Sequence, residues 1–208
     1  MKYFYVPGDE RSSVELLMLH GTGGDESSLV EMGRSLVPGA SVLGVKGEVN
    51  ESGMNRWFKR YAEGVFDESS IVEESAKLAE FLRGRSWLEG SAPAGNDFVV
   101  RRIAVGYSNG ANIGGALLQL ASDVLDGLVM LRGMLPLVPS ELPSLFGKKV
   151  LMVNGKMDDM GPLSSAYRMR DLLIECGAEV QFQELPTGHQ LSRLDFELCA
   201  DWLRQFAE

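Results

Sequence analysis

Cysteine and histidine are scarce in this sequence of 208 residues. The two cysteines, Cys176 and Cys199, fall in stretches of helical periodicity and show no disulfide spacing, so we expect buried thiols. The only histidines, His20 and His189, cannot assemble a metal site with them. The sequence therefore predicts no metal centre.

Long apolar runs are also absent. No run approaches the roughly 20 residues that a transmembrane helix needs. Residues 1–8 contain neither a long apolar core nor a small-residue cleavage site, so they do not indicate a secretory signal. We expect a cytoplasmic protein without a membrane span.

Positive charge is in deficit, with 20 Lys and Arg against 29 Asp and Glu, a formal net charge of −9. The basic residues are scattered along the chain, so nucleic acid is not an expected partner. Apolar residues make up 45% and charged residues 24%, which is typical of a globular chain. The length suits one well-packed domain spanning residues 1–208.

Short apolar runs alternate with longer stretches of helical periodicity, a pattern typical of strands joined by crossover helices. The prediction is an α/β fold with a mostly parallel sheet of about six or seven strands and helices on both faces. Strands are expected at residues 15–19, 41–45, 99–105, 127–131, 149–153 and 180–184, with an edge strand at 3–6. Helices are expected at residues 27–35, 69–83, 109–121, 164–176 and 191–206.

Two segments depart from this alternation. Residues 84–97 are rich in Gly, Pro and Asn, which indicates a surface loop. Residues 46–66 carry several aromatic side chains interrupted by glycines, without a clear period. We interpret this second segment as a candidate flap over a pocket.

The stretch Gly106-Tyr107-Ser108-Asn109-Gly110 lies between an expected strand and an expected helix of small residues. This is the setting of a nucleophile elbow, a tight turn that holds a serine hydroxyl away from the backbone. Glycine at both flanks removes side chains that would clash in such a turn. Because Gly-x-Ser-x-Gly by itself is a weak match, the prediction depends on this context.

A glycine-rich turn, His20-Gly21-Thr22-Gly23-Gly24, follows the expected strand at 15–19. In hydrolases with a nucleophile elbow, this loop donates one oxyanion-hole amide and the residue after the serine donates the other. The candidate donors are the backbone amides of Thr22 and Asn109. His20 is expected to orient the loop by hydrogen bonding, and the absence of a phosphate-binding glycine motif argues against a nucleotide site.

Carboxylates and a histidine follow the last two expected strands. Asp158 and Asp159 come after the strand at 149–153, and His189 comes after the strand at 180–184. A carboxylate there can fix the tautomer of an imidazole, and we choose Asp158, with Asp159 as the alternative. The chain order Ser108, Asp158, His189 is the order that such hydrolases use, so His189 is the candidate general base.

Together these motifs resemble the small carboxylesterase/phospholipase family of α/β-hydrolases, which includes bacterial carboxylesterases and acyl-protein thioesterases, and within it a bacterial subgroup described as hydroquinone-linked hydrolases. The resemblance is carried by residues 19–26, 106–112, 155–158 and 188–189, and extends to 56–58 and 63–68. It implies the α/β-hydrolase fold, with Ser108 as nucleophile, Asp158 as acid and His189 as base. It also implies Thr22 and Asn109 as the oxyanion amides. Thioesterase members usually carry Gln at the position of Asn109, which weakens any transfer of long-chain acyl specificity.

The expected function is that of a serine hydrolase that cleaves carboxylic esters or thioesters of small molecules through an acyl-enzyme, without a cofactor. One alternative is a lactone or dienelactone-type hydrolase, in which a cysteine nucleophile would be expected. Another is a non-catalytic hydrolase-like protein that binds a small ligand. The sequence leaves the oligomeric state open, a homodimer included. Candidate residues for an apolar acyl pocket, each of which fits a core position at least as well, are Met54, Trp57, Phe58, Met134, Leu135 and Met160.

Overall fold

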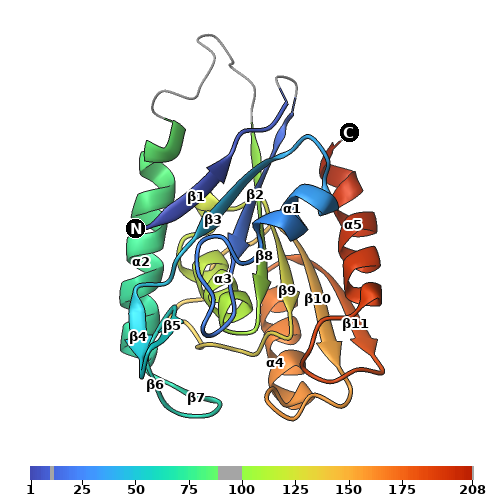
Figure 1. Cartoon of the computed structure of the whole chain (residues 1–208). Helices are drawn as coiled ribbons and strands as arrows, with labels where there is room; N and C mark the ends of the chain where they lie inside the picture. Colours follow the sequence, from blue (N-terminus) through green and yellow to red (C-terminus); the bar gives the residue numbers. More distant parts are fainter. Residues whose placement is uncertain (10–11, 89–99, 208) are drawn as a thin grey trace.

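The structure of the chain is a computed structural model that describes residues 1–9, 12–88 and 100–207. Its main sheet has seven strands in the order β1-β3-β2-β8-β9-β10-β11 (Figure 1). All neighbouring strands are parallel except the edge pair β1 and β3, so the predicted mostly parallel sheet is confirmed. The strands are β1 (Tyr3–Val6), β2 (Val14–Leu19), β3 (Ser41–Val45), β8 (Arg101–Tyr107), β9 (Gly127–Leu131), β10 (Lys149–Gly155) and β11 (Glu179–Leu185).

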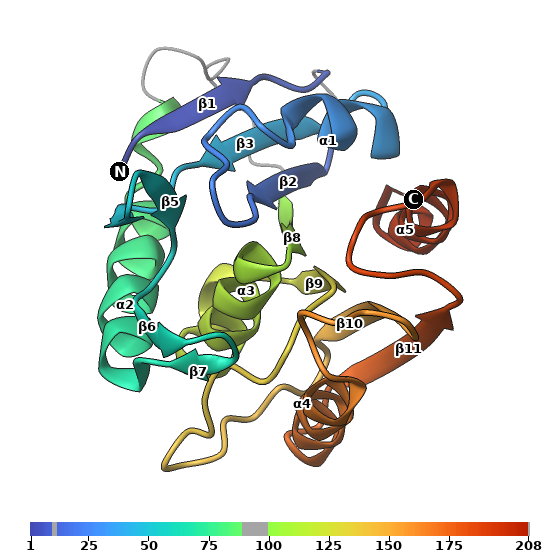
Figure 2. The ribbon, with the colours of Figure 1, turned by 60° about the horizontal axis from the view of Figure 1, so that its bottom comes forward.

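Helices cover both faces of the sheet, as predicted (Figure 2). One face packs against α2 (Glu68–Gly84), α3 (Asn109–Leu120) and α4 (Leu163–Glu175), and the other against α1 (Val30–Leu36) and α5 (Arg193–Ala207). Two short 3₁₀ turns, Ser86–Leu88 and Ser122–Val124, complete the helical part.

The central strands lack polar alternation because both of their faces are buried. In β2, Leu17 and Leu19 belong to one hydrophobic core, whereas Leu16 and Met18 belong to the core on the opposite face. Successive side chains of a strand point to opposite faces, so each strand contributes to both cores. The short apolar runs of the sequence are therefore fully buried strands.

Two expected helices begin later than predicted, for local reasons. The helix expected at 27–35 begins at Val30, because the Asp25 carboxylate accepts bonds from Ser27 and Ser28 and holds them in a turn. The helix expected at 191–206 begins at Arg193, because the Asp195 carboxylate reaches back to the Ser192 amide in a capping arrangement.

The strand expected at 99–105 occupies Arg101–Tyr107 and continues into the elbow motif. Residue 99, and residues 89–97 of the expected loop, lie outside the described residues. Within the described part of that loop, Gly84 ends α2 and a 3₁₀ turn follows.

Residues 46–66 form two small hairpins beside the carboxyl ends of the central strands. The first pairs β4 (Val49–Glu51) with β5 (Met54–Arg56), and the second pairs β6 (Arg60–Ala62) with β7 (Val65–Phe66). Between them, Trp57 and Phe58 are buried in the core that contains α2 and α3. The junction between the hairpins is thus anchored in the core. That residues 46–66 act as a flap over a pocket stays a prediction, as does the single domain spanning residues 1–208.

Both cysteines are free and buried, as the sequence predicts. Burial raises the pKa of the Cys199 thiol to about 12, and it also raises the pKa of Cys176. None of the described helices is both long enough and apolar enough to cross a bilayer.

Candidate active site

Ser108 lies at the tip of a strained turn between β8 and α3. Its φ of 53° is in the left-handed region, which non-glycine residues seldom occupy. A Cβ atom on Gly106 would stand 2.4 Å from the Gly110 carbonyl oxygen, and one on Gly110 would stand 2.0 Å from the Leu19 carbonyl oxygen. Only glycine fits at either flank, so the local sequence produces the elbow and presents the hydroxyl.

The structure brings Ser108, His189 and Asp158 together from three separate loops. Nε2 of His189 lies 3.0 Å from Ser108 Oγ, and Nδ1 lies 3.0 and 2.9 Å from the two carboxylate oxygens of Asp158. The Asp158 side chain is 1% exposed and that of His189 is 15% exposed. With Nδ1 donating to a carboxylate, Nε2 carries the lone pair that faces the serine hydroxyl.

Asp158 and Asp159, adjacent in sequence, have different surroundings. Asp158 Oδ1 also accepts hydrogen bonds from the Met160 and Gly161 amides, at 2.9 and 3.1 Å, which fixes the carboxylate toward the imidazole. Asp159 is exposed and makes no recorded side-chain contact within the described residues. The geometry therefore separates two candidates that the sequence left open.

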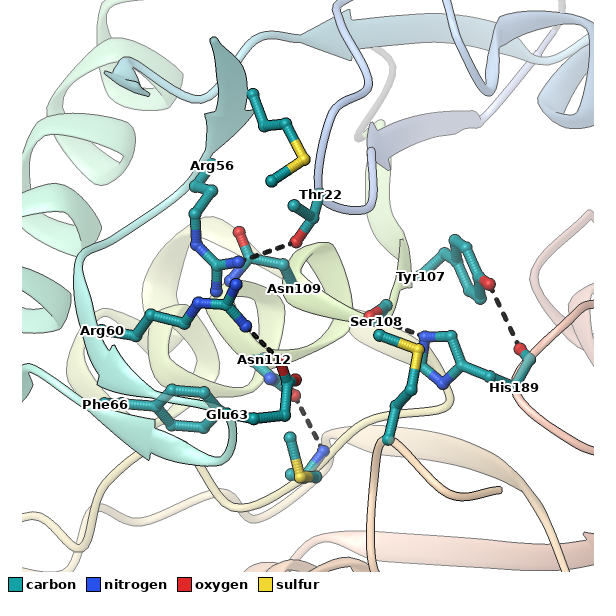
Figure 3. Close-up of a pocket in the computed structure, with 13 residues that line it drawn as sticks. Thr22, Arg56, Arg60, Glu63, Phe66, Tyr107, Ser108, Asn109, Asn112 and His189 are labelled. Atoms are coloured by element: carbon teal, nitrogen blue, oxygen red, sulfur yellow. Dashed lines mark hydrogen bonds and ion pairs between the residues drawn. The ribbon is translucent and has the colours of Figure 1, made fainter. Parts of the chain in front are cut away.

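Thr22 and Asn109 line the same cavity as Ser108 (Figure 3). Neither amide donates a recorded hydrogen bond to any residue that the structure describes. The Asn109 amide also stands at the first turn of α3, where backbone N–H groups lack helical partners and favour negative charge. Both amides therefore remain candidates for the oxyanion donors.

His20 holds the glycine-rich loop by hydrogen bonds and is not among the residues that line the cavity. Its Nδ1 donates to the Gly21 carbonyl at 2.7 Å, and its Nε2 accepts from the Gly47 amide at 3.0 Å. This pair of bonds requires the neutral ring. Burial lowers the pKa of His20 below its ordinary value of 6.5, which is consistent with that state.

The β5 segment fastens the glycine-rich loop from the other side. The Trp57 indole N–H donates to the His20 carbonyl at 2.9 Å, and the side-chain amide of Asn55 donates to the Gly24 carbonyl at 2.8 Å. The Trp57 backbone N–H donates to the Asn109 side chain at 2.7 Å. Trp57 thus bonds both to the glycine-rich loop and to Asn109, the residue after the serine.

Arg132 is a functional candidate that sequence reasoning missed. Its side chain is fully buried and forms a two-pronged ion pair with Asp195, at 2.6 and 2.9 Å. It also donates to the carbonyls of Gly188 and Gln190, on either side of His189, at 2.9 and 3.1 Å. The one available signal was a charged residue directly after an apolar strand.

The cavity around Ser108 has a volume of about 320 Å³. Three of the expected pocket residues, Met54, Met134 and Met160, line it. The other three do not line it: Trp57 and Phe58 are core residues, the alternative that the sequence left open, and Leu135 lines a neighbouring surface pocket. Polar side chains that the sequence did not single out complete the wall: Arg56, Arg60, Glu63 and Asn112.

No protein-family model matches the chain. It is 38% identical over 205 residues to the Bacillus subtilis (strain 168) protein named "Putative hydrolase MhqD", covering 99% of this chain and 98% of that relative. It is also similar to the crystal structure of the Bacillus cereus carboxylesterase, at 35% identity and a TM-score of 0.90, covering 99% of this chain and 94% of that one. A carboxylesterase from Mesorhizobium loti shares 30% identity at a TM-score of 0.80, over 93% and 90% of the two chains.

These similarities extend over nearly the whole length of each protein, so they concern the complete sheet and its loops. They agree with the resemblance drawn from the motifs and with the seven-stranded sheet. The chain therefore belongs to the carboxylesterase family of α/β-hydrolases and is a carboxylesterase-like hydrolase.

Proposed function

We propose that the protein is a serine hydrolase that cleaves carboxylic esters and thioesters of small molecules through an acyl-enzyme on Ser108. One observation carries the proposal: the imidazole of His189 contacts the Ser108 hydroxyl on one side and the Asp158 carboxylate on the other. Serine hydroxyls are weak nucleophiles, and an adjacent base oriented by a carboxylate is what activates them.

In the proposed reaction, Nε2 of His189 takes the Ser108 proton as the hydroxyl attacks the acyl carbonyl. The carbonyl oxygen becomes an oxyanion and is bound by the Thr22 and Asn109 amides. The imidazolium, stabilised by Asp158, then gives its proton to the leaving alcohol or thiol. A water molecule activated by the same base hydrolyses the acyl-enzyme and regenerates the serine.

Replacement of the nucleophile tests this function. Ser108→Ala should lower kcat/KM for 4-nitrophenyl butyrate and a butyryl thioester by at least about 10⁴-fold, because the covalent route is lost. Ser35→Ala, an exposed serine on α1, is the matched control and should retain full activity. A fluorophosphonate probe should label the wild type and the control but not the Ser108 variant. Turnover or labelling that survives in Ser108→Ala would refute the proposal.

A further inference from the structure

One wall of the Ser108 cavity is rich in hydrogen-bond donors. Arg56, Arg60 and Asn112 line it together with Ser108 (Figure 3). Arg56 comes from β5, Arg60 from β6 and Asn112 from α3, so three separate elements contribute to this wall. The Arg56 side chain is only 4% exposed, and Asn112 is likewise buried. Arg56 and Asn112 each keep one nitrogen without a hydrogen bond to the described residues, and both side chains line the cavity.

Arg56 uses two of its three nitrogens within the protein. Nε donates to the Phe58 carbonyl at 3.4 Å, and Nη1 lies 3.1 Å from Thr22 Oγ1 and 3.3 Å from a Glu51 carboxylate oxygen. For Nη2 no hydrogen bond is recorded among residues 1–9, 12–88 and 100–207. A guanidinium has five N–H donors and no acceptor, so this end can only be satisfied by an acceptor.

Asn112 presents a donor whose direction is fixed. Its Oδ1 accepts the Met134 amide at 2.8 Å, which leaves Nδ2 as the free end of the side-chain amide. Nδ2 has no recorded acceptor in the described part of the chain. Asn112 follows Ser108 by four residues, so it lies one helical turn beyond the elbow and on the same side of α3.

Two glutamates lie beside the two arginines of this wall, and they are shared unevenly. Glu51 pairs with both Arg56 and Arg60, and Glu63 is bonded to Arg60. Burial, followed by repulsion from Arg60, holds the pKa of the Arg56 guanidinium below its ordinary value despite Glu51 and Glu63. The pKa of Arg60 is instead raised by its hydrogen bond to Glu51. Arg56 thus shares its direct carboxylate partner, Glu51, with Arg60, and Glu63 is bonded to Arg60 rather than to Arg56.

The position of this wall indicates which part of a substrate reaches it. His189 lies on the opposite side of Ser108 from Arg56 and Arg60 (Figure 3). In an acyl-transfer reaction the imidazole must protonate the leaving group, so the leaving group occupies the His189 side. The acyl chain then extends toward the donor-rich wall.

We propose that Arg56 and Asn112 form a subsite for a carboxylate on the acyl part of the substrate, so that half-esters and half-thioesters of short dicarboxylic acids are preferred. This inference rests on the proposed function. The net charge of −9 opposes the approach of an anion at long range, but at ordinary ionic strength that field is screened beyond about 8 Å. Charge-assisted bonds within the cavity are screened much less and decide the preference.

The test compares two substrates that differ only in the distal charge, 4-nitrophenyl hydrogen adipate and 4-nitrophenyl methyl adipate. We expect the wild type to favour the anionic ester in kcat/KM by about tenfold or more, a ratio that corresponds to about 1.4 kcal/mol. Arg56→Lys should keep part of the preference and Arg56→Met should lose it. Since Arg56 is buried, unfolding of the Met variant is checked by circular dichroism.

Asn112→Asp provides a second variant that preserves the local fold. The carboxylate still accepts the Met134 amide, but it replaces the Nδ2 donor with a negative charge. The preference should therefore reverse toward the methyl ester. Arg193→Gln, which removes a cation that is 91% exposed on α5, is the matched control and should leave the ratio unchanged.

The possible failures are distinguishable. If the wild type hydrolyses both esters with equal efficiency, or prefers the methyl ester, the carboxylate subsite is refuted while the proposed function stands. If the preference exists but persists in Arg56→Met and Asn112→Asp, its location is wrong. If neither ester is cleaved and the fluorophosphonate probe does not react, the proposed function itself fails.

Discussion

The two sides of the Ser108 cavity are held in place by different means. On the base side, the loop around His189 is fastened by Arg132, whose charge is fully buried and paired with Asp195. On the side of the proposed oxyanion amides, several separate hydrogen bonds hold the glycine-rich loop, from the side chains of Trp57, Asn55 and Arg56 and through the ring of His20.

This difference has an energetic consequence. Breaking a buried ion pair by removing one partner leaves an uncompensated charge, which costs much more than losing one neutral hydrogen bond. The loop around His189 therefore depends mainly on Arg132, whereas the glycine-rich loop is held by several separate hydrogen bonds. Each side should respond to substitution accordingly.

The largest effect is expected within the proposed triad and separates the two neighbouring carboxylates. Asp158→Asn should lower kcat by about 10³- to 10⁴-fold, because an amide can donate to Nδ1 and favour the wrong imidazole tautomer. Asp159→Asn is the matched control and should change activity little, since that side chain is exposed. Steady-state kinetics with 4-nitrophenyl butyrate measures both, and equal losses in the two variants would contradict the geometry.

The next effect tests how much Arg132 stabilises the loop around His189. Arg132→Met should lower the free energy of unfolding by about 3–5 kcal/mol, because Asp195 remains buried without its partner. Adding Asp195→Leu should recover part of that stability by removing the buried charge left without Arg132, but it also removes the cap on Ser192 and does not restore the bonds to Gly188 and Gln190. Urea denaturation gives both values. A cost below about 1 kcal/mol for the single variant would remove the distinction between the two sides.

A smaller effect is expected on the oxyanion side. Trp57→Phe removes the indole N–H and leaves the His20 carbonyl unsatisfied, which should cost about 1–3 kcal/mol. Activity should fall far less than in Asp158→Asn, because Asn55 and His20 still hold the loop. Unfolding and kinetics on the same samples provide the measurement. If the cost equals that of Arg132→Met, support on this side is not distributed.

The smallest effect is a pH dependence of stability that comes from His20. Its folded-state pKa lies below 6.5, so the unfolded chain binds this proton more readily than the folded chain. Stability should fall as pH decreases from about 6.5 through the folded pKa, and should not depend on this group at higher pH. His20→Gln cannot ionise, and urea midpoints between pH 8 and pH 5 should decline less in it than in the wild type. Parallel curves would refute the assignment.

Much of the fold was predictable because it depends on local patterns. The strand that contains Leu16 and Leu17 was found from its apolar run, and the elbow from Gly106 and Gly110, whose absent side chains are a steric requirement of the turn. Helix starts were less accurate, because side chains such as Asp25 and Asp195 form turns and caps that compete with the helical period.

The pocket was less predictable for a different reason. Trp57 and Phe58 have the composition of an apolar pocket wall but are buried in the core, whereas Arg56, next to them, faces the cavity. Composition alone does not distinguish these positions, because the direction of a side chain in an irregular segment depends on what packs against it. The same limit left Asp159 open as an alternative to Asp158.

By itself, the sequence determined the α/β alternation, the elbow at Ser108, the glycine-rich loop at Thr22 and the short list of candidate titratable groups. Each of these depends on residues that are close together in the chain. The tertiary structure alone decided which carboxylate meets His189, that Arg132 holds its loop, and that Arg56 and Asn112 share one wall. These contacts join residues that are tens of positions apart, and only the packing of helices against the sheet brings them within bonding distance.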